Sequence, residues 1–262
     1  MPAPDEFTLL CERCGYEIES LPREEECPEC GKPIAESLPE RRTGTPWQHE
    51  QTWRALLRTG WMTVRSPLVT LDDMQANEEI GVEQSNRLTI LAGAITSIPV
   101  MLAITLAEPL IGPLVAPVVL LVVTAFIAPF LSLLTYIEVR GIQFFATRRG
   151  GRLTRAMAWS ICGHGSAGWV LAASGISIGA SVAALAVSAT VQRGFFTPTL
   201  NTVVNVGSTL ALLGFLAGFL FFETFAWLGV RRCKFANRAS PQEPEQTATT
   251  ASEDQTQPNP AS

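Results

Sequence analysis

The segment Leu88-Thr-Ile-Leu-Ala-Gly-Ala-Ile-Thr-Ser-Ile-Pro-Val-Met-Leu-Ala-Ile-Thr-Leu106 contains nineteen residues and no formal charge. Because a helix rises about 1.5 Å per residue, this run can cross the roughly 30 Å hydrocarbon core of a bilayer. Glu108 and Pro109 end it, and a second apolar run follows from Leu110 to Ile137. The sequence therefore predicts an all-α membrane helical bundle over residues 88–234.

The number of spans depends on the apolar stretch Ala156–Val191, which is followed by a last one at Thr202–Val230. As one helix, Ala156–Val191 would be about 54 Å long, more than one upright span needs. It could form two short spans broken near Gly175, or one span plus a buried or interfacial piece. Length favours five spans in all. The positive-inside rule favours four, because the basic run Arg231–Arg238 then lies inside with the basic loop Arg140–Arg155.

The segment before these spans is a soluble, acidic head. Residues 1–40 hold eleven acidic residues against three basic ones, within a chain of 262 residues and net charge -5. This balance argues against nucleic-acid binding, which needs a basic face. Met1–Leu10 lacks the basic and apolar pattern of a signal peptide, so we expect the head to be cytosolic.

Four cysteines in the head form two Cys-x-x-Cys-Gly knuckles, at Cys11 and Cys14 and again at Cys27 and Cys30. Two residues between the cysteines let one turn aim both sulfurs at one ion, and the glycine after each pair permits positive φ. The spacing predicts a structural, tetrahedral zinc site in a zinc-ribbon-like β knuckle over residues 1–36. Rubredoxin-like iron, two disulfides or unrelated thiols are the alternatives.

Residues 37–46 are expected to be a polar linker, and residues 47–87 a juxtamembrane region. Trp53, Leu56, Leu57 and Trp61 fall on one face of a helix. With Trp47, the tryptophans suggest interfacial anchors of a helix that lies in the membrane surface. The alternative is a helix that packs on the bundle without touching lipid.

Two ionisable residues, His164 and Glu223, lie within apolar stretches, where such groups are costly. If the number of spans is even, both lie at one depth and are expected to be neighbours. Their contact would fix helix packing, or it would serve ion or solute transport.

Two glycine motifs, Gly175/Gly179 and Gly214/Gly218, let helix backbones approach closely, and they could also support an oligomer. Residues 235–262 are expected to be a disordered tail.

The order of parts resembles the Yip family of membrane proteins, whose eukaryotic members interact with Rab-type GTPases. The resemblance rests on the amphipathic stretch with Ser66-Pro67, the two spans that follow it, and the loop that starts at Gly150-Gly151 and leads into Trp159 and Trp169. It implies five spans, a cytosolic head and a C-terminus on the far side. The basic run Arg231–Arg238 departs from that topology.

The leading hypothesis is a non-enzymatic membrane protein with a role in membrane organisation, trafficking or scaffolding. Its zinc knuckle could contact a protein partner. The second hypothesis is a small-solute or ion transporter that uses His164 and Glu223. No catalytic motif favours a membrane enzyme.

Overall fold

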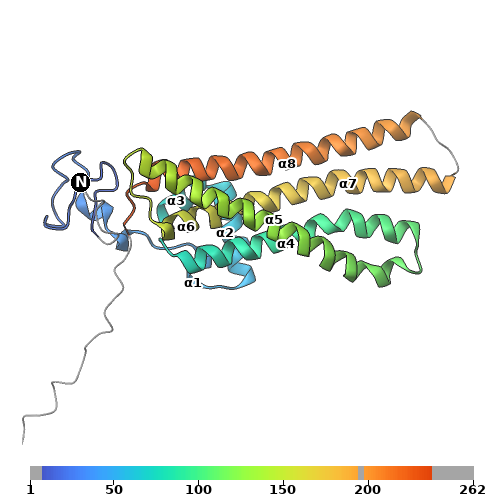
Figure 1. Ribbon diagram of the computed structural model, residues 1–262, viewed down its shortest axis with the longest axis horizontal. Helices are drawn as coiled ribbons and strands as arrows, with labels where there is room; N and C mark the ends of the chain where they lie inside the picture. Colours follow the sequence, from blue (N-terminus) through green and yellow to red (C-terminus); the bar gives the residue numbers. More distant parts are fainter. Residues whose placement is uncertain (1–7, 194–197, 238–262) are drawn as a thin grey trace, which may run out of the picture.

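The computed structural model describes residues 8–193 and 198–237, and in these ranges the chain is almost entirely helical outside the head (Figure 1). The described residues form ten helical elements, four of them 27 to 37 residues long, so the predicted all-α bundle is confirmed. The first five are η1 (Ile34–Ser37), η2 (Pro39–Arg41), α1 (Pro46–His49), α2 (Trp53–Arg65) and α3 (Pro67–Asp73). The other five are α4 (Glu78–Ala107), α5 (Gly112–Arg148), α6 (Arg155–Gly165), α7 (Ala167–Arg193) and α8 (Pro198–Cys233).

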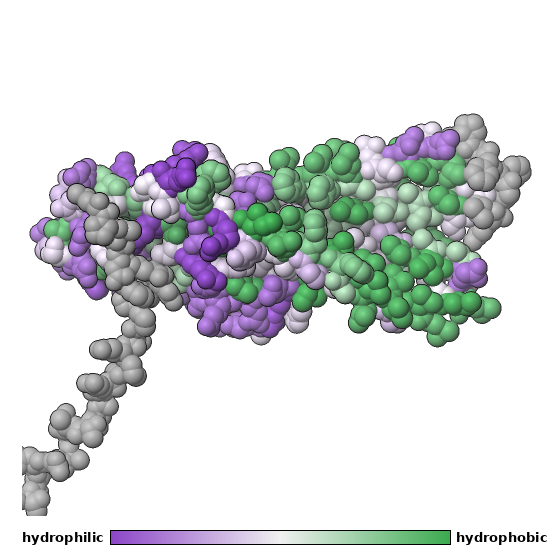
Figure 2. All heavy atoms as spheres, viewed as in Figure 1, coloured by the Kyte–Doolittle hydropathy of each residue, from purple (hydrophilic) through white to green (hydrophobic). Residues whose placement is uncertain are grey.

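Four stretches of the described chain are long and apolar enough to cross a membrane: Glu78–Ala107, Gly112–Arg148, Arg155–Thr190 and Leu200–Cys233. Their apolar side chains form a broad band over the half of the bundle that lies away from the head (Figure 2). An outward-facing apolar band of this kind is suited to lipid, because water would be a poor solvent for it. The chain is therefore an integral membrane protein by its helical architecture.

The first span begins earlier than predicted, at Glu78 rather than Leu88. The side chain of Asn77 caps this helix by accepting a hydrogen bond from the Ile80 amide at 3.1 Å. The polar residues 78–87 thus form the first turns of α4 instead of a separate loop. Part of this polar segment is buried against α6, which explains why the helix extends beyond the apolar run.

The long third apolar stretch is divided at Ser166, and α7 continues without a break through Gly175. The Ser166 hydroxyl donates to the Cys162 carbonyl at 2.8 Å and contacts the Ser85 hydroxyl at 3.1 Å. Helix α6 is buried along all but its first residue. The structure therefore matches the alternative of one span plus a buried piece, and not two short spans broken near Gly175.

Helices α7 and α8 pack closely through both predicted glycine motifs. A Cβ atom added to Gly175 would lie 2.3 Å from Gly214 Cα, and one added to Gly218 would lie 2.3 Å from the Ala172 nitrogen. Only glycine permits this backbone contact. Gly175 faces Gly214, while Gly179 lies against Gly207 and Ala211, so these glycines are used for packing within the chain. An oligomer through these faces stays a prediction.

The two helical hairpins α4–α5 and α7–α8 lie side by side, with α4 against both α5 and α7. The head and the C-terminal end of α8 lie at the same end of the bundle (Figure 1). The main hydrophobic core lies at this end, where residues from α3 to α8 meet around Met74, Met157, Trp169, Phe222 and Phe225. The far half has few buried side chains, as expected where lipid replaces protein as the neighbour.

Candidate metal centre and its docking on the bundle

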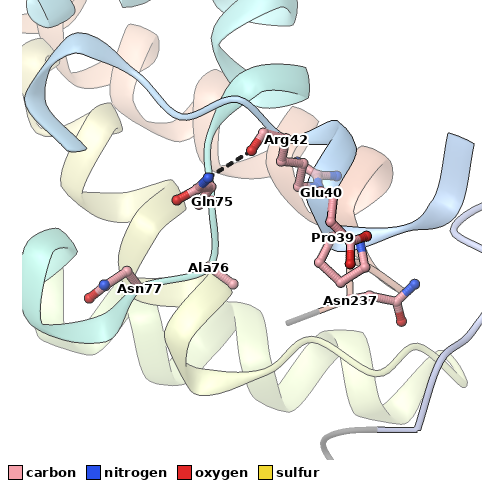
Figure 3. Close-up of a pocket in the computed structure, with 7 residues that line it drawn as sticks. All are labelled: Pro39, Glu40, Arg42, Gln75, Ala76, Asn77 and Asn237. Atoms are coloured by element: carbon pink, nitrogen blue, oxygen red, sulfur yellow. Dashed lines mark hydrogen bonds between the residues drawn. The ribbon is translucent and has the colours of Figure 1, made fainter. Parts of the chain in front are cut away.

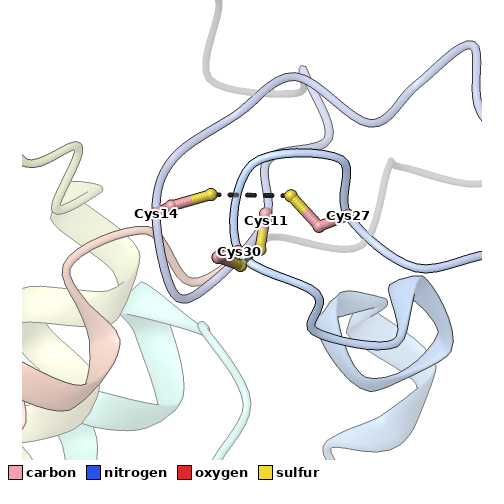
Figure 4. A group of neighbouring side chains, drawn as sticks. All are labelled: Cys11, Cys14, Cys27 and Cys30. Carbon is pink, nitrogen blue, oxygen red and sulfur yellow. Dashed lines mark hydrogen bonds between the residues drawn. The ribbon is translucent and has the colours of Figure 1, made fainter.

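The four head cysteines converge on one point (Figure 4). All four sulfurs lie within 4.8 Å of one another, with Cys11 3.5 Å from Cys30 and Cys14 3.6 Å from Cys27. A disulfide would need about 2.05 Å, and all six cysteines of the chain are free thiols. Tetrahedral coordination with metal–sulfur bonds of about 2.3 Å separates the sulfurs by about 3.8 Å. The geometry is thus compatible with a metal site and excludes the disulfide alternative.

Each knuckle is a tight turn closed by its glycine. Gly15 and Gly31 have φ of 82° and 67°, and their amides donate to the Cys11 and Cys27 carbonyls at 2.8 Å. Each turn is flanked by an isolated antiparallel bridge, Leu10 with Glu17 and Glu26 with Pro33. The zinc-ribbon-like β structure predicted for the head is therefore not found. The described residues of the head form these two bridges and no strand. A turn at Glu19–Ser20 follows the first bridge, and the second ends at Pro33, which has no N–H and is followed at once by η1, so neither bridge extends into a ladder.

Electrostatics of the cluster favour a bound cation. Burial raises the pKa of the Cys11 thiol, but backbone hydrogen bonds from Cys14 and Arg13 lower it to about 7. At Cys14, partial burial and the neighbouring cysteine sulfurs raise the pKa to about 12. Four thiolates at these distances would repel one another unless a divalent cation lay between them.

The head is held on the bundle by Arg42, which lies in the segment predicted to be a polar linker. This side chain is buried, pairs with Glu12 at 3.0 Å, and donates to the carbonyls of Leu71 at 2.8 Å and Met74 at 3.2 Å. It thus connects the head to the residues before α4. Within the predicted linker, Ser37, Leu38, Arg42 and Thr45 are buried, whereas Glu40, Arg41 and Thr43 are exposed.

Asn237 provides the second connection, from the segment predicted to be disordered. Its side-chain amide accepts from the Leu10 amide at 2.9 Å and donates to the carbonyls of Leu10 at 2.7 Å and Ser37 at 2.6 Å. Phe235 and Ala236 are buried beside it, and Phe235 lies against Gly15. The disordered tail therefore cannot begin at residue 235; residues 238–262 lie outside the described part of the chain.

A cavity of about 400 Å³ lies beside this junction, lined by Pro39, Arg42, Gln75, Asn77 and Asn237 among others (Figure 3). Gln75 donates from its side chain to the Arg42 carbonyl at 2.8 Å across it. These polar groups are satisfied by the chain itself. The cavity therefore marks the junction between the head and the bundle, and it contains no catalytic constellation.

His164 and Glu223 are not joined by a hydrogen bond or an ion pair in the described structure. The fully buried His164 ring has Nε2 3.0 Å from the Thr45 hydroxyl and Nδ1 2.8 Å from the Ser160 carbonyl. Both ring nitrogens are thus occupied by other partners. Glu223 is half-buried on α8. These contacts tie α6 to Thr45, the residue before α1. The packing role proposed for a contact between His164 and Glu223 stays a prediction.

The three predicted tryptophan anchors separate into two kinds. Trp53 and Trp61 are 52% and 65% exposed, whereas Trp47 is fully buried and donates from its indole to the Ile80 carbonyl at 3.2 Å. Trp47 packs in a small cluster with Leu56 and Leu88. It cannot be an interfacial anchor. The predicted single stripe is also divided, since Leu56 faces the protein and Trp53, Leu57 and Trp61 face outward.

The sequence did not indicate that Arg42 and Asn237 contact both the four-cysteine head and its surroundings. Neither belongs to a motif, and their partners are up to 227 residues away in the chain. One local signal was present: the basic run Arg231–Arg238 also contains the apolar residues Phe235 and Ala236.

Taken together, these features define an integral membrane protein with a four-cysteine cluster held at one end of its helical bundle. Comparison of the chain with family models, curated proteins and solved structures found no match.

Proposed function

We propose that this chain is a non-enzymatic membrane protein whose zinc-bound head forms a rigid platform at the cytosolic end of the bundle. The observation that carries the proposal is the docking of the head. The metal cluster is not tethered by a free linker but is fixed by Arg42 and Asn237 to the helical core. A fixed platform at the membrane surface suits a role in membrane organisation, trafficking or scaffolding.

Zinc is the ion that best suits this donor set. Four cysteines fill a tetrahedral shell and leave no open position for water or substrate. A head of about thirty residues cannot build an adequate core by itself, so the metal would supply much of its folding energy. The head's own core is small, with Ile18, Ile34 and Leu38 around Cys11 and Cys27.

The resemblance to the Yip family stays part of this proposal. It is supported by the order of parts and by the Gly150-Gly151 loop. Gly150 adopts a φ of 71°, and the Gly151 amide donates to the Ala146 carbonyl at 2.9 Å to end α5. The four candidate spans of this chain differ from the five that the family implies. No family residue that binds a partner is carried over.

No specific observation favours the transporter hypothesis. Five cavities along the described residues have linings that include neither His164 nor Glu223. Packing around His164 is close, with Gly163 in backbone contact with Gly81.

Reconstitution of the full chain in liposomes distinguishes the two hypotheses. We expect proton and cation flux equal to that of protein-free liposomes, and one zinc per chain by elemental analysis. Flux that is abolished by Glu223→Gln would overturn the platform proposal in favour of transport. Metal-free protein with a normally folded head would overturn the structural role of zinc.

A further inference from the structure

A positively charged cleft lies between the metal head and the nearby ends of α5 and α8. Four cations line it: Arg13 from the head, Arg149 after α5, Arg231 from α8 and Lys234 after α8. Its volume is about 380 Å³, and the rest of its lining is Ala146, Gly151 and Val230. The cleft, hereafter the basic cleft, thus combines a small, largely apolar floor with cations from three parts of the chain.

These four cations have no acidic partner in the described structure. An adjoining cavity of about 460 Å³ shares Arg13, Arg231 and Lys234, and it also contains Glu12, Glu36 and Asp72. Two of these acids are already committed: Glu12 to Arg42 and Lys32, and Asp72 to Arg232. Glu36 lines only the adjoining cavity. The basic cleft therefore has an uncompensated positive charge that an anion would neutralise.

The cations are held in place before any ligand binds. The Arg231 guanidinium lies 4.7 Å from the centre of the Trp227 ring, and Lys234 Nζ lies 4.7 Å from the centre of the Phe235 ring. Arg13 donates to the Cys30 carbonyl at 3.4 Å, so the metal loop positions it. Such preorganisation reduces the entropy lost when an anion binds.

Exposed aromatic side chains lie close in sequence to the cations of the basic cleft. Trp227 on α8 is 52% exposed and Phe145 on α5 is 60% exposed, both within one or two helical turns of the cleft cations. A phosphate in the cleft could therefore belong to a molecule whose acyl chains follow α5 and α8.

We propose that the basic cleft binds the phosphate of an anionic phospholipid headgroup. Phosphate oxygens suit several Arg and Lys donors at once, and basic pockets beside membrane helices recognise such headgroups. The zinc head contributes directly through Arg13, so lipid recognition would depend on the folded metal loop. This inference does not depend on the biological role proposed above.

The test is a binding titration of the full, zinc-loaded chain in a neutral detergent. Its probes are short-chain phosphatidylglycerol, phosphatidylcholine of equal chain length, and inorganic phosphate. We expect Arg149→Gln/Arg231→Gln to weaken phosphatidylglycerol binding by about tenfold to thirtyfold, and Arg13→Gln to weaken it by about fivefold. The matched control is Arg23→Gln/Arg65→Gln, which removes two exposed charges outside the cleft.

The control variant is expected to bind phosphatidylglycerol like the unmodified chain, and all variants to keep their zinc and their thermal unfolding midpoint. Equal weakening by the control pair would overturn the proposal, because bulk charge would then account for binding. Equal affinity for phosphatidylcholine would also overturn it. If inorganic phosphate binds as tightly as the lipid and is lost in the same variants, the cleft is a site for soluble phosphate and the lipid proposal fails.

Discussion

Single residues decide whether the metal head exists as a folded unit. Cys27 is buried, and its sulfur lies 3.6 Å from that of Cys14. A serine oxygen is a harder and less easily ionised donor, so it replaces a zinc thiolate poorly. The other three cysteines would then bind metal through an incomplete shell.

We expect Cys27→Ser to reduce zinc from about one ion per chain to nearly none while the chain still inserts into membranes. Elemental analysis of purified protein and membrane fractionation measure both quantities. Cys162→Ser is the control, since that thiol is buried in α6 and is not part of the cluster. Retention of zinc in Cys27→Ser, or its loss in Cys162→Ser, would contradict the four-cysteine site.

The contact between Thr45 and His164 is a second residue-scale determinant. Both side chains are buried, and replacing the threonine hydroxyl by a methyl group leaves the histidine Nε2 without a partner. Thr45→Val is expected to lower the free energy of unfolding by about 1–3 kcal/mol. The measurement is denaturant unfolding in detergent.

Thr209→Val is the matched control, because Thr209 is exposed and bonds only to the carbonyl one turn earlier in α8. Its effect should stay within about 0.5 kcal/mol. If the two variants unfold alike, the Thr45–His164 contact does not contribute to stability.

The sequence predicted the role of single residues only where their partners lie close by in the chain. Two short motifs contain Cys11, Cys14, Cys27 and Cys30. A motif of this kind predicts that its two cysteine sulfurs point toward one ion. Arg42 and Asn237 act through carbonyls that the fold brings from distant segments, and no local pattern records such a contact. For the same reason, the burial of Trp47 could not be distinguished from interfacial exposure.

At the scale of elements, the spacing of α7 and α8 is set by glycine. We expect Gly175→Ala to lower the free energy of unfolding by about 1–3 kcal/mol, because its Cβ would lie 2.3 Å from Gly214 Cα and the helices would have to separate. Gly141→Ala in α5 is the control, since a Cβ there meets no atom within 4 Å. Helix propensity predicts that this control is neutral or more stable by up to about 1 kcal/mol. Equal destabilisation by both changes would refute close packing of α7 on α8.

Helix α2 presents Trp53, Leu57 and Trp61 outward and Leu56 inward. Its outward face has the i, i+4, i+8 spacing of a helix that rests in a membrane interface. In bilayers with lipids brominated near the headgroup, we expect tryptophan fluorescence quenching to decrease in Trp53→Phe/Trp61→Phe. Trp47→Phe should leave the quenching unchanged because Trp47 is buried. Quenching that is insensitive to the double change would show that α2 does not reach lipid.

Element boundaries were less predictable than element types. Apolar runs indicated the spans, but α4 extends back to Glu78 because its polar first turns are covered by protein. The sequence also did not indicate that the helix is divided at Ser166, since the segments before and after this residue are both apolar. Hydropathy indicates which residues avoid water. It does not distinguish a residue that faces lipid from one that is buried in protein, as the residues of α6 are.

At the scale of the whole molecule, the structure places the head, the loop between α5 and α6, and the end of α8 together. Arg152 in that loop donates from its backbone to the Lys234 carbonyl at 2.7 Å, which joins two of these segments directly. The basic residues Arg148, Arg149, Arg231 and Arg232 therefore lie at one end of the bundle. The positive-inside rule predicts that this end faces the cytosol.

We therefore expect both chain termini on the cytosolic side, because an even number of spans returns the chain to its starting side and residues 238–262 contain no apolar run. Fusions of a fluorescent protein that matures only in the cytosol, placed at either terminus, should both fluoresce. The matched control is the same reporter inserted after Glu108 in the turn between α4 and α5, which should stay dark because that turn lies at the opposite end. A dark C-terminal fusion beside a fluorescent N-terminal one would indicate an odd number of spans, and with it the topology that the Yip family implies.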